Sequence, residues 1–101
     1  MSIKLVALYR KPADVDAFMA HYEQVHLPLV AKTPHLIKTV VGRVTGSPMG
    51  EPAYFLTAEM VFPDAARFRE AMRSPENQAA GKDLMGFAAD LVTLIVVEEQ
   101  V

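Results

Sequence analysis

The residues best suited to chemistry lie in one segment, Asp14–Lys32, which contains two of the three histidines, His21 and His26. An unperturbed imidazole has a pKa of about 6.5, so it can accept or donate a proton near neutral pH. His26 lies beside the apolar stripe of this segment, whereas His21 lies on the opposite border, nearer to water. We therefore expect His26 to carry out proton transfer. The alternative is a structural histidine at a helix border.

Four further side chains are candidates for the same site. Tyr22 stands one helical turn before His26, so it could share a ligand with the imidazole. The alternative is that the Tyr22 ring belongs to the core and its hydroxyl reaches water. Asp83 could orient the imidazole, as carboxylates commonly do; its alternative is a solvated acid on a helix. Tyr9 and Tyr54 lie in predicted strands and could line the same cavity, although packing would be their first role. The predicted catalytic residues are His26, Tyr22 and Asp83, and the predicted ligand-binding residues are Tyr9 and Tyr54.

Metal and cofactor sites have little support in the sequence. The chain contains no cysteine, which excludes disulfides, thiol catalysis and thiolate metal sites. His21 and His26 are five residues apart, whereas two ligands on one helix face stand four apart. We therefore expect His21 and His35 to be surface groups. No phosphate-binding glycine loop or nucleophile elbow is present, so we expect no metal and no cofactor.

The segment that carries His26 has the pattern of one amphipathic helix. Its apolar stripe, at 100° per residue, is formed by Phe18, Tyr22, Val25 and Leu29. Asp14 can cap the start of the helix by accepting hydrogen bonds from free amides. Pro28 has no amide hydrogen, and its ring crowds the carbonyl of Gln24, at a cost of roughly 3 kcal/mol. We therefore expect the helix to kink or loosen just after His26.

The rest of the chain predicts four strands and two further helices. The predicted strands are 3–10, 36–44, 53–62 and 91–97, and the later helices are 64–73 and 75–88. The order β-α-β-β-α-α-β is the split β-α-β, ferredoxin-like plan with one extra short helix. We therefore predict one α+β domain over residues 1–101, with a four-stranded antiparallel sheet and helices on one of its faces.

Composition narrows the class of protein. The chain has 101 residues, of which 51% are hydrophobic, enough for one core. The net charge of −2 and the lack of a basic run argue against nucleic-acid binding. Charge interrupts the N-terminal apolar run too early for a secretion signal, and no apolar segment approaches the ~20 residues that span a bilayer. We expect a cytoplasmic protein with no nucleic-acid or membrane partner.

Several predicted strands carry apolar residues on both faces. In strand 3–10, Val6 and Leu8 stand on the face opposite Leu5 and Ala7, and strand 91–97 is almost wholly apolar. Because the helices can cover only one face, we expect a second copy of the chain to cover the other, sheet against sheet. The alternative is a monomer whose second face is mildly apolar.

Two groups of residues form a recognisable signature. The N-terminal group is Leu8-Tyr9-Arg10-Lys11-Pro12, Phe18, Tyr22 and Val25-His26-Leu27-Pro28-Leu29-Val30. The C-terminal group is Phe68, Met72, Ser74-Pro75-Glu76, Gly81, Asp83, Phe87 and the final apolar strand. Together they resemble the EthD-domain family, named for a protein linked to ethyl tert-butyl ether degradation. The resemblance covers nearly the whole chain, and its most specific part is the His-x-Pro-Leu element. The sequence departs from the family at Thr33-Pro34-His35-Leu36, where relatives commonly have Pro-Gly-Leu.

The EthD family is similar to the dimeric α/β-barrel superfamily, which implies ferredoxin-like protomers that pair sheet to sheet as a homodimer. That superfamily includes monooxygenases, lactone isomerases and haem- or chlorite-acting enzymes. The resemblance thus implies a role in small-molecule catabolism. Together with the histidine, it suggests cofactor-independent proton transfer of the isomerase, lyase or oxygenase-accessory type, in a cleft between helices and sheet. The alternative is a non-catalytic protein that binds or carries a small ligand on the same dimeric scaffold.

Overall fold

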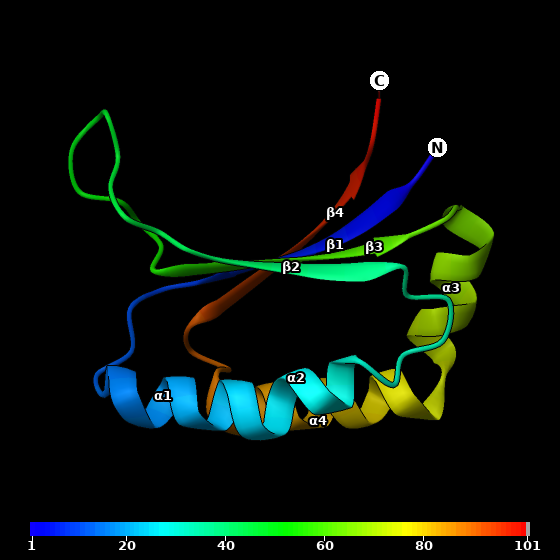
Figure 1. Ribbon diagram of the computed structural model, residues 1–101, viewed down its shortest axis with the longest axis horizontal. Helices are drawn as coiled ribbons and strands as arrows, with labels where there is room; N and C mark the ends of the chain where they lie inside the picture. The colour runs from blue at the N-terminus through cyan, green and yellow to red at the C-terminus, as the bar shows by residue number, and fades with distance from the viewer. Residues whose placement is uncertain (101) are drawn as a thin grey trace.

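Four antiparallel strands form one sheet, and the helices pack against one of its faces (Figure 1). The strands are β1 (Ile3–Tyr9), β2 (Lys38–Arg43), β3 (Leu56–Phe62) and β4 (Val92–Glu98). The computed structural model describes residues 1–100. The strand order β2-β3-β1-β4, with every neighbouring pair antiparallel, is the split β-α-β arrangement that the sequence predicts.

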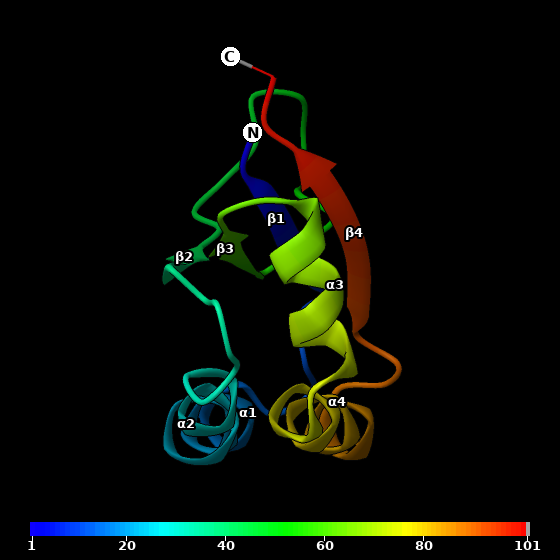
Figure 2. The same cartoon turned by 90° about the vertical axis from the view of Figure 1, so that its right-hand side faces the viewer.

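The helices form two rows beneath the sheet. The helical elements are α1 (Val15–His21), η1 (Tyr22–His26), α2 (Leu27–Val30), α3 (Ala65–Arg73) and α4 (Pro75–Phe87). Figure 2 shows α1 and α2 in one row and α4 in the other, while α3 rises from α4 toward the sheet. In residues 1–100 no helix combines the length and the apolar character that crossing a membrane would require.

Polar side chains at the helix starts satisfy the free backbone amides. Asp14 Oδ1 accepts a hydrogen bond from the backbone N–H of Ala17 at 3.0 Å, which confirms the predicted cap of α1. Ser74 Oγ accepts from the backbone N–H of Asn77 at 3.1 Å, and Pro75 follows as the first residue of α4. These local contacts explain why both helices begin where the sequence predicts.

The segment that contains His26 is a continuous helix with one wide turn. Within η1 the hydrogen bonds have the π-helical i→i+5 pattern, as in the bond from the Leu27 amide to the Tyr22 carbonyl. The wide turn comes directly before Pro28, whose ring would crowd the carbonyl of Gln24 in a regular α-helix. The expected loosening is therefore present, but it precedes His26 and does not follow it.

The wide turn shifts the buried stripe of this helix by one residue. The stripe predicted from a 3.6-residue period continues from Tyr22 to Val25 and Leu29. In the structure the buried residues after Tyr22 are His26 and Val30, whereas Val25 is 41% exposed. The prediction was wrong for Val25, because a π-turn holds more residues than an α-turn, whereas Leu29 packs partly buried against the core as expected. As a result, His26 faces the sheet.

The turn between α2 and β2 contains a residue other than glycine in the left-handed backbone conformation. His35 has a φ of 66°, a conformation that costs most side chains energy. Its Nε2 lies 3.0 Å from Oε2 of Glu70 on α3. His35 therefore adopts the left-handed conformation that more commonly belongs to glycine.

The face of the sheet away from the helices is covered by no helix of the described chain and is partly apolar; it is called the bare face below. Alternation along the strands places Val6, Val40 and Ile95 on this face, in one row across the sheet with Glu59. Val40 is 47% exposed and Ile95 is 44% exposed. Residues 1–100 thus form an open sheet and not a closed barrel, so a barrel would require a second chain.

Candidate functional site

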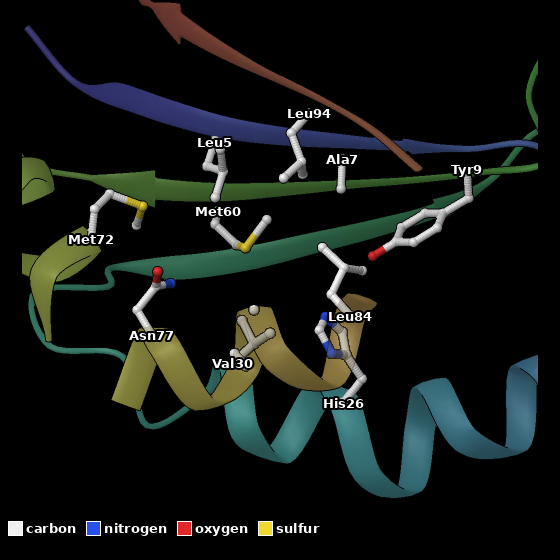
Figure 3. A pocket seen from close by; sticks show the side chains of 12 residues that line it. Leu5, Ala7, Tyr9, His26, Val30, Met60, Met72, Asn77, Leu84 and Leu94 are labelled. Carbon is white, nitrogen blue, oxygen red and sulfur yellow. The ribbon is translucent and has the colours of Figure 1, made fainter. Parts of the chain in front are cut away.

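A cavity of about 160 Å³ lies between the helix-facing side of the sheet and the helices α2 and α4 (Figure 3). Most of its wall is apolar, formed by residues that include Leu5, Ala7, Val30, Met60, Leu84 and Leu94. Three polar side chains, those of Tyr9, His26 and Asn77, also line it. An apolar wall with a few polar groups is typical of sites for small organic ligands.

The imidazole of His26 is held by a carboxylate from α4. Nδ1 of His26 lies 3.0 Å from Oδ2 of Asp83, and the two side chains are only 7% and 16% exposed. An ionised carboxylate can only accept hydrogen bonds, so Nδ1 carries the hydrogen. Nε2 of the neutral ring then carries the lone pair. The nitrogen left free for a ligand is therefore the basic one.

His21 joins this pair although its side chain lies at the surface, as expected, and is 36% exposed. Its Nε2 donates a hydrogen bond to Oδ1 of Asp83 at 2.8 Å. The two histidines are five residues apart, and the π-turn between them brings such residues to the same side of the helix. Asp83 therefore lies between two imidazoles and is not the solvated acid weighed as its alternative. Within residues 1–100 no group of three or more His, Asp or Glu side chains is arranged to hold a metal ion.

Burial keeps His26 in its basic form. Desolvation lowers the pKa of His26, because the imidazolium loses its hydration inside the protein. The Asp83 carboxylate acts in the opposite direction, and His21 lowers the pKa further. The net shift is downward, so the ring is neutral near pH 7 and can accept a proton.

Two tyrosines connect the imidazole to the core. The ring of Tyr22 stacks on that of His26 with centroids 5.7 Å apart, and it meets the ring of Tyr9 edge-on at 5.5 Å. Burial raises the pKa of Tyr22 to about 12 and raises the pKa of Tyr9 still further, with Tyr22 and then Asp83 adding to the shift of Tyr9. Both phenols therefore stay protonated, and Figure 3 shows the Tyr9 hydroxyl directed into the cavity.

Sequence reasoning placed one residue wrongly and missed another. Tyr54 precedes β3 and lines a separate hollow with Lys11 and Arg43, so the structure does not bring it to the cavity of His26. Asn77 was missed, although it stands three residues before buried Ala80 on α4. Figure 3 shows the amide of Asn77 directed toward the cavity, at the end away from Tyr9.

Comparisons with known proteins agree with this architecture. The model of the EthD domain matches residues 10–90. A solved structure of an EthD family protein from Bacillus halodurans is 46% identical, covers 99% of this chain and 100% of its own, and has a TM-score of 0.94. An uncharacterized 11.0 kDa protein from the thcB-thcC intergenic region of Rhodococcus erythropolis is 31% identical over 97 residues, 96% of this chain and 94% of that protein.

More distant solved structures share the fold alone. A dimeric ferredoxin-like protein of unknown function from Jannaschia is 17% identical, with a TM-score of 0.71 over 98% of this chain and 100% of its own. SnoaB from Streptomyces nogalater, a cofactor-independent oxygenase, is 13% identical, with a TM-score of 0.72 over 99% of this chain and 93% of its own. These likenesses confirm the predicted α+β, ferredoxin-like class. Because the family model spans most of the chain and the Bacillus protein aligns along nearly all of it, the chain belongs to the EthD family.

Proposed function

We propose that this protein catalyses proton transfer on a small organic molecule without a cofactor, as a step in small-molecule catabolism. The observation that supports the proposal is the pairing of His26 Nδ1 with the Asp83 carboxylate at 3.0 Å beside a largely apolar cavity. This pairing leaves Nε2 as a base, and burial keeps it unprotonated at neutral pH.

The proposed step uses three side chains of the site. Nε2 of His26 removes a proton from an acidic C–H or O–H bond of the ligand, and Asp83 stabilises the imidazolium that forms. The Tyr9 phenol, protonated and directed into the cavity, donates a hydrogen bond to the oxygen on which negative charge develops. Return of the proton to a different atom of the anion would complete an isomerisation. The fold shared with SnoaB, a cofactor-independent oxygenase, supports chemistry of this kind on the scaffold.

The cavity limits the size of the ligand. Its volume of about 160 Å³ is close to the roughly 150 Å³ of an engineered apolar cavity that binds benzene. The polar groups lie at opposite ends, Tyr9 at one and Asn77 at the other (Figure 3). We therefore propose a compound with one ring or an equivalent short chain, with an ionisable group near His26 and a polar group that hydrogen-bonds to Asn77.

Replacing Gly81 by leucine is expected to weaken binding of such compounds about tenfold or more. Gly81 lines the cavity, and a Cβ atom built on it meets no atom within 4 Å. A β-carbon at this position therefore has room, and the remainder of the leucine side chain would take up ligand space. Calorimetric titration with single-ring phenols and lactones measures the change. Gln78→Leu is the matched control, because Gln78 is exposed on the same helix; an equal loss of affinity in both variants would contradict the placement of the ligand.

A non-catalytic carrier is the second candidate. The mostly apolar wall of the cavity favours it, because apolar contact alone can retain a ligand. A carrier would bind single-ring compounds and release them chemically unchanged. Analysis of the released compound by mass spectrometry and NMR separates a carrier from an isomerase, whose product differs in structure.

We also propose that two copies pair through the bare face of the sheet. The exposed apolar residues of this face, among them Val40 and Ile95, would be covered by the same residues of the partner. The dimeric description of the ferredoxin-like protein from Jannaschia supports this arrangement.

Replacing Ile95 by lysine is expected to convert the dimer to a monomer, because it buries a charge at the proposed interface. Light scattering after size-exclusion chromatography measures the mass. Val96→Lys is the control, because Val96 is also exposed, at 59%, but stands on the opposite face of β4. A wild-type monomer, or a dimer that survives Ile95→Lys, would contradict the proposed interface.

A further inference from the structure

We propose that His21 is a positioning residue for His26 and that it acts through Asp83. This inference rests on the proposed role of His26 as the base. It assigns a function to a side chain that does not line the cavity and would not touch the ligand.

The geometry gives each oxygen of Asp83 its own partner. Oδ1 accepts from Nε2 of His21 at 2.8 Å, and Oδ2 faces Nδ1 of His26 at 3.0 Å. The ring of His21 is itself held against Phe87, with centroids 4.5 Å apart. Rotation of the carboxylate would lengthen both hydrogen bonds, so His21 fixes the orientation in which Asp83 meets His26.

Without His21, the outer side of Asp83 would be free to turn away from the imidazole. That side faces a surface hollow lined by Ala79, Lys82 and Gly86, where water would solvate the carboxylate. Nδ1 of His26 would then lose its acceptor. The tautomer with hydrogen on Nε2 would become populated, and a protonated Nε2 cannot accept a proton from the ligand.

His21 also affects the pKa of His26 through its charge. The ionisable groups around His21 are Asp83 and Lys82 on α4, and Asp14, which lines the hollow on its other side. Those around His26 are Asp83, His21 and two phenols that stay neutral. A positive charge on His21 disfavours a proton on His26, whereas the Asp83 carboxylate favours one.

Nitrogen-15 NMR of the histidine rings tests this role without any ligand. In wild type we expect His26 to carry its hydrogen on Nδ1. In His21→Phe, which retains a ring against Phe87, we expect the Nε2–H tautomer to increase several-fold. In His21→Gln the amide can still donate to Oδ1, so the wild-type tautomer should be restored. In His21→Gln the titration midpoint of His26 should rise, because the positive charge of His21 is gone while Asp83 still faces the imidazole. His35→Gln, at the exposed histidine bound to Glu70, should change neither readout.

An unchanged tautomer in His21→Phe would overturn the proposal. If His21→Phe fails to fold, as judged by circular dichroism, the tautomer in His21→Ala decides: an increased Nε2–H form supports the role and the wild-type tautomer refutes it. Failure of the proposed function has a different signature. In that case the wild-type protein turns over no compound, whereas the tautomer and midpoint still respond to substitution of His21.

Discussion

Replacing His26 by glutamine is expected to lower turnover by roughly 10²–10⁴-fold, the contribution typical of a general base, and to leave the fold intact. Glutamine is similar in length, and its amide can still donate a hydrogen bond to the Asp83 carboxylate, 3.0 Å from the imidazole in wild type. It has no nitrogen lone pair that accepts a proton near neutral pH. The loss should therefore fall on the chemical step, with a smaller effect on ligand affinity.

Single-turnover kinetics with a compound identified by ligand screening measures the effect of His26→Gln, and thermal unfolding checks the fold. His35→Gln is the matched control, because it makes the same change at a histidine outside the cavity. Undiminished turnover in His26→Gln would remove His26 from the chemistry. Equal losses in both variants would indicate a general effect on the protein.

Replacing Asp83 by asparagine is expected to have an effect of similar size, on the order of 10²–10⁴-fold in turnover. The same change in the serine protease triad lowers turnover by about 10⁴-fold, because the amide allows the wrong histidine tautomer. Here the amide nitrogen of asparagine could donate to Nδ1 of His26, which would move the ring hydrogen to Nε2 and block proton abstraction. Asparagine also carries no charge, so it stabilises the imidazolium less than the carboxylate does.

The measurement for Asp83→Asn combines turnover with the ring nitrogen shifts of His26. Asp90→Asn is the control, because it makes the same change at an exposed acid whose backbone carbonyl, and not its carboxylate, binds Arg10. Turnover near the wild-type level in Asp83→Asn would show that the carboxylate does not support the base. A normal tautomer together with lost turnover would show that charge matters more than orientation.

Most of the fold could be predicted because its signals are local. Alternation along β1 and the capping residues Asp14 and Ser74 act within a few positions of the chain, and the structure has the elements that they predict. The strand order follows from the order of elements and from the preference for antiparallel neighbours. The bare sheet face was also visible in the sequence, because Val6 and Ile95 stand opposite the core positions of their strands.

The site was less predictable because its contacts depend on a local defect and on distant residues. A regular 3.6-residue period places His21 and His26 on different sides of the helix, whereas the π-turn brings both to Asp83. Asp83 lies 57 residues from His26 in the sequence, so no local pattern could show their contact. Pro28 was the available signal for the defect, although it did not reveal on which side of His26 the helix would widen.

Exchange of acidic C–H protons in D₂O tests the proposed base most directly, because it follows proton transfer without requiring a known product. A panel of single-ring lactones, diketones and phenols is incubated with wild-type protein or His26→Gln, and loss of proton NMR signal gives the exchange rate. We predict that wild type accelerates exchange in at least one ring compound and that His26→Gln does not. Rates equal to those without protein, or an undiminished rate with His26→Gln, would contradict the account.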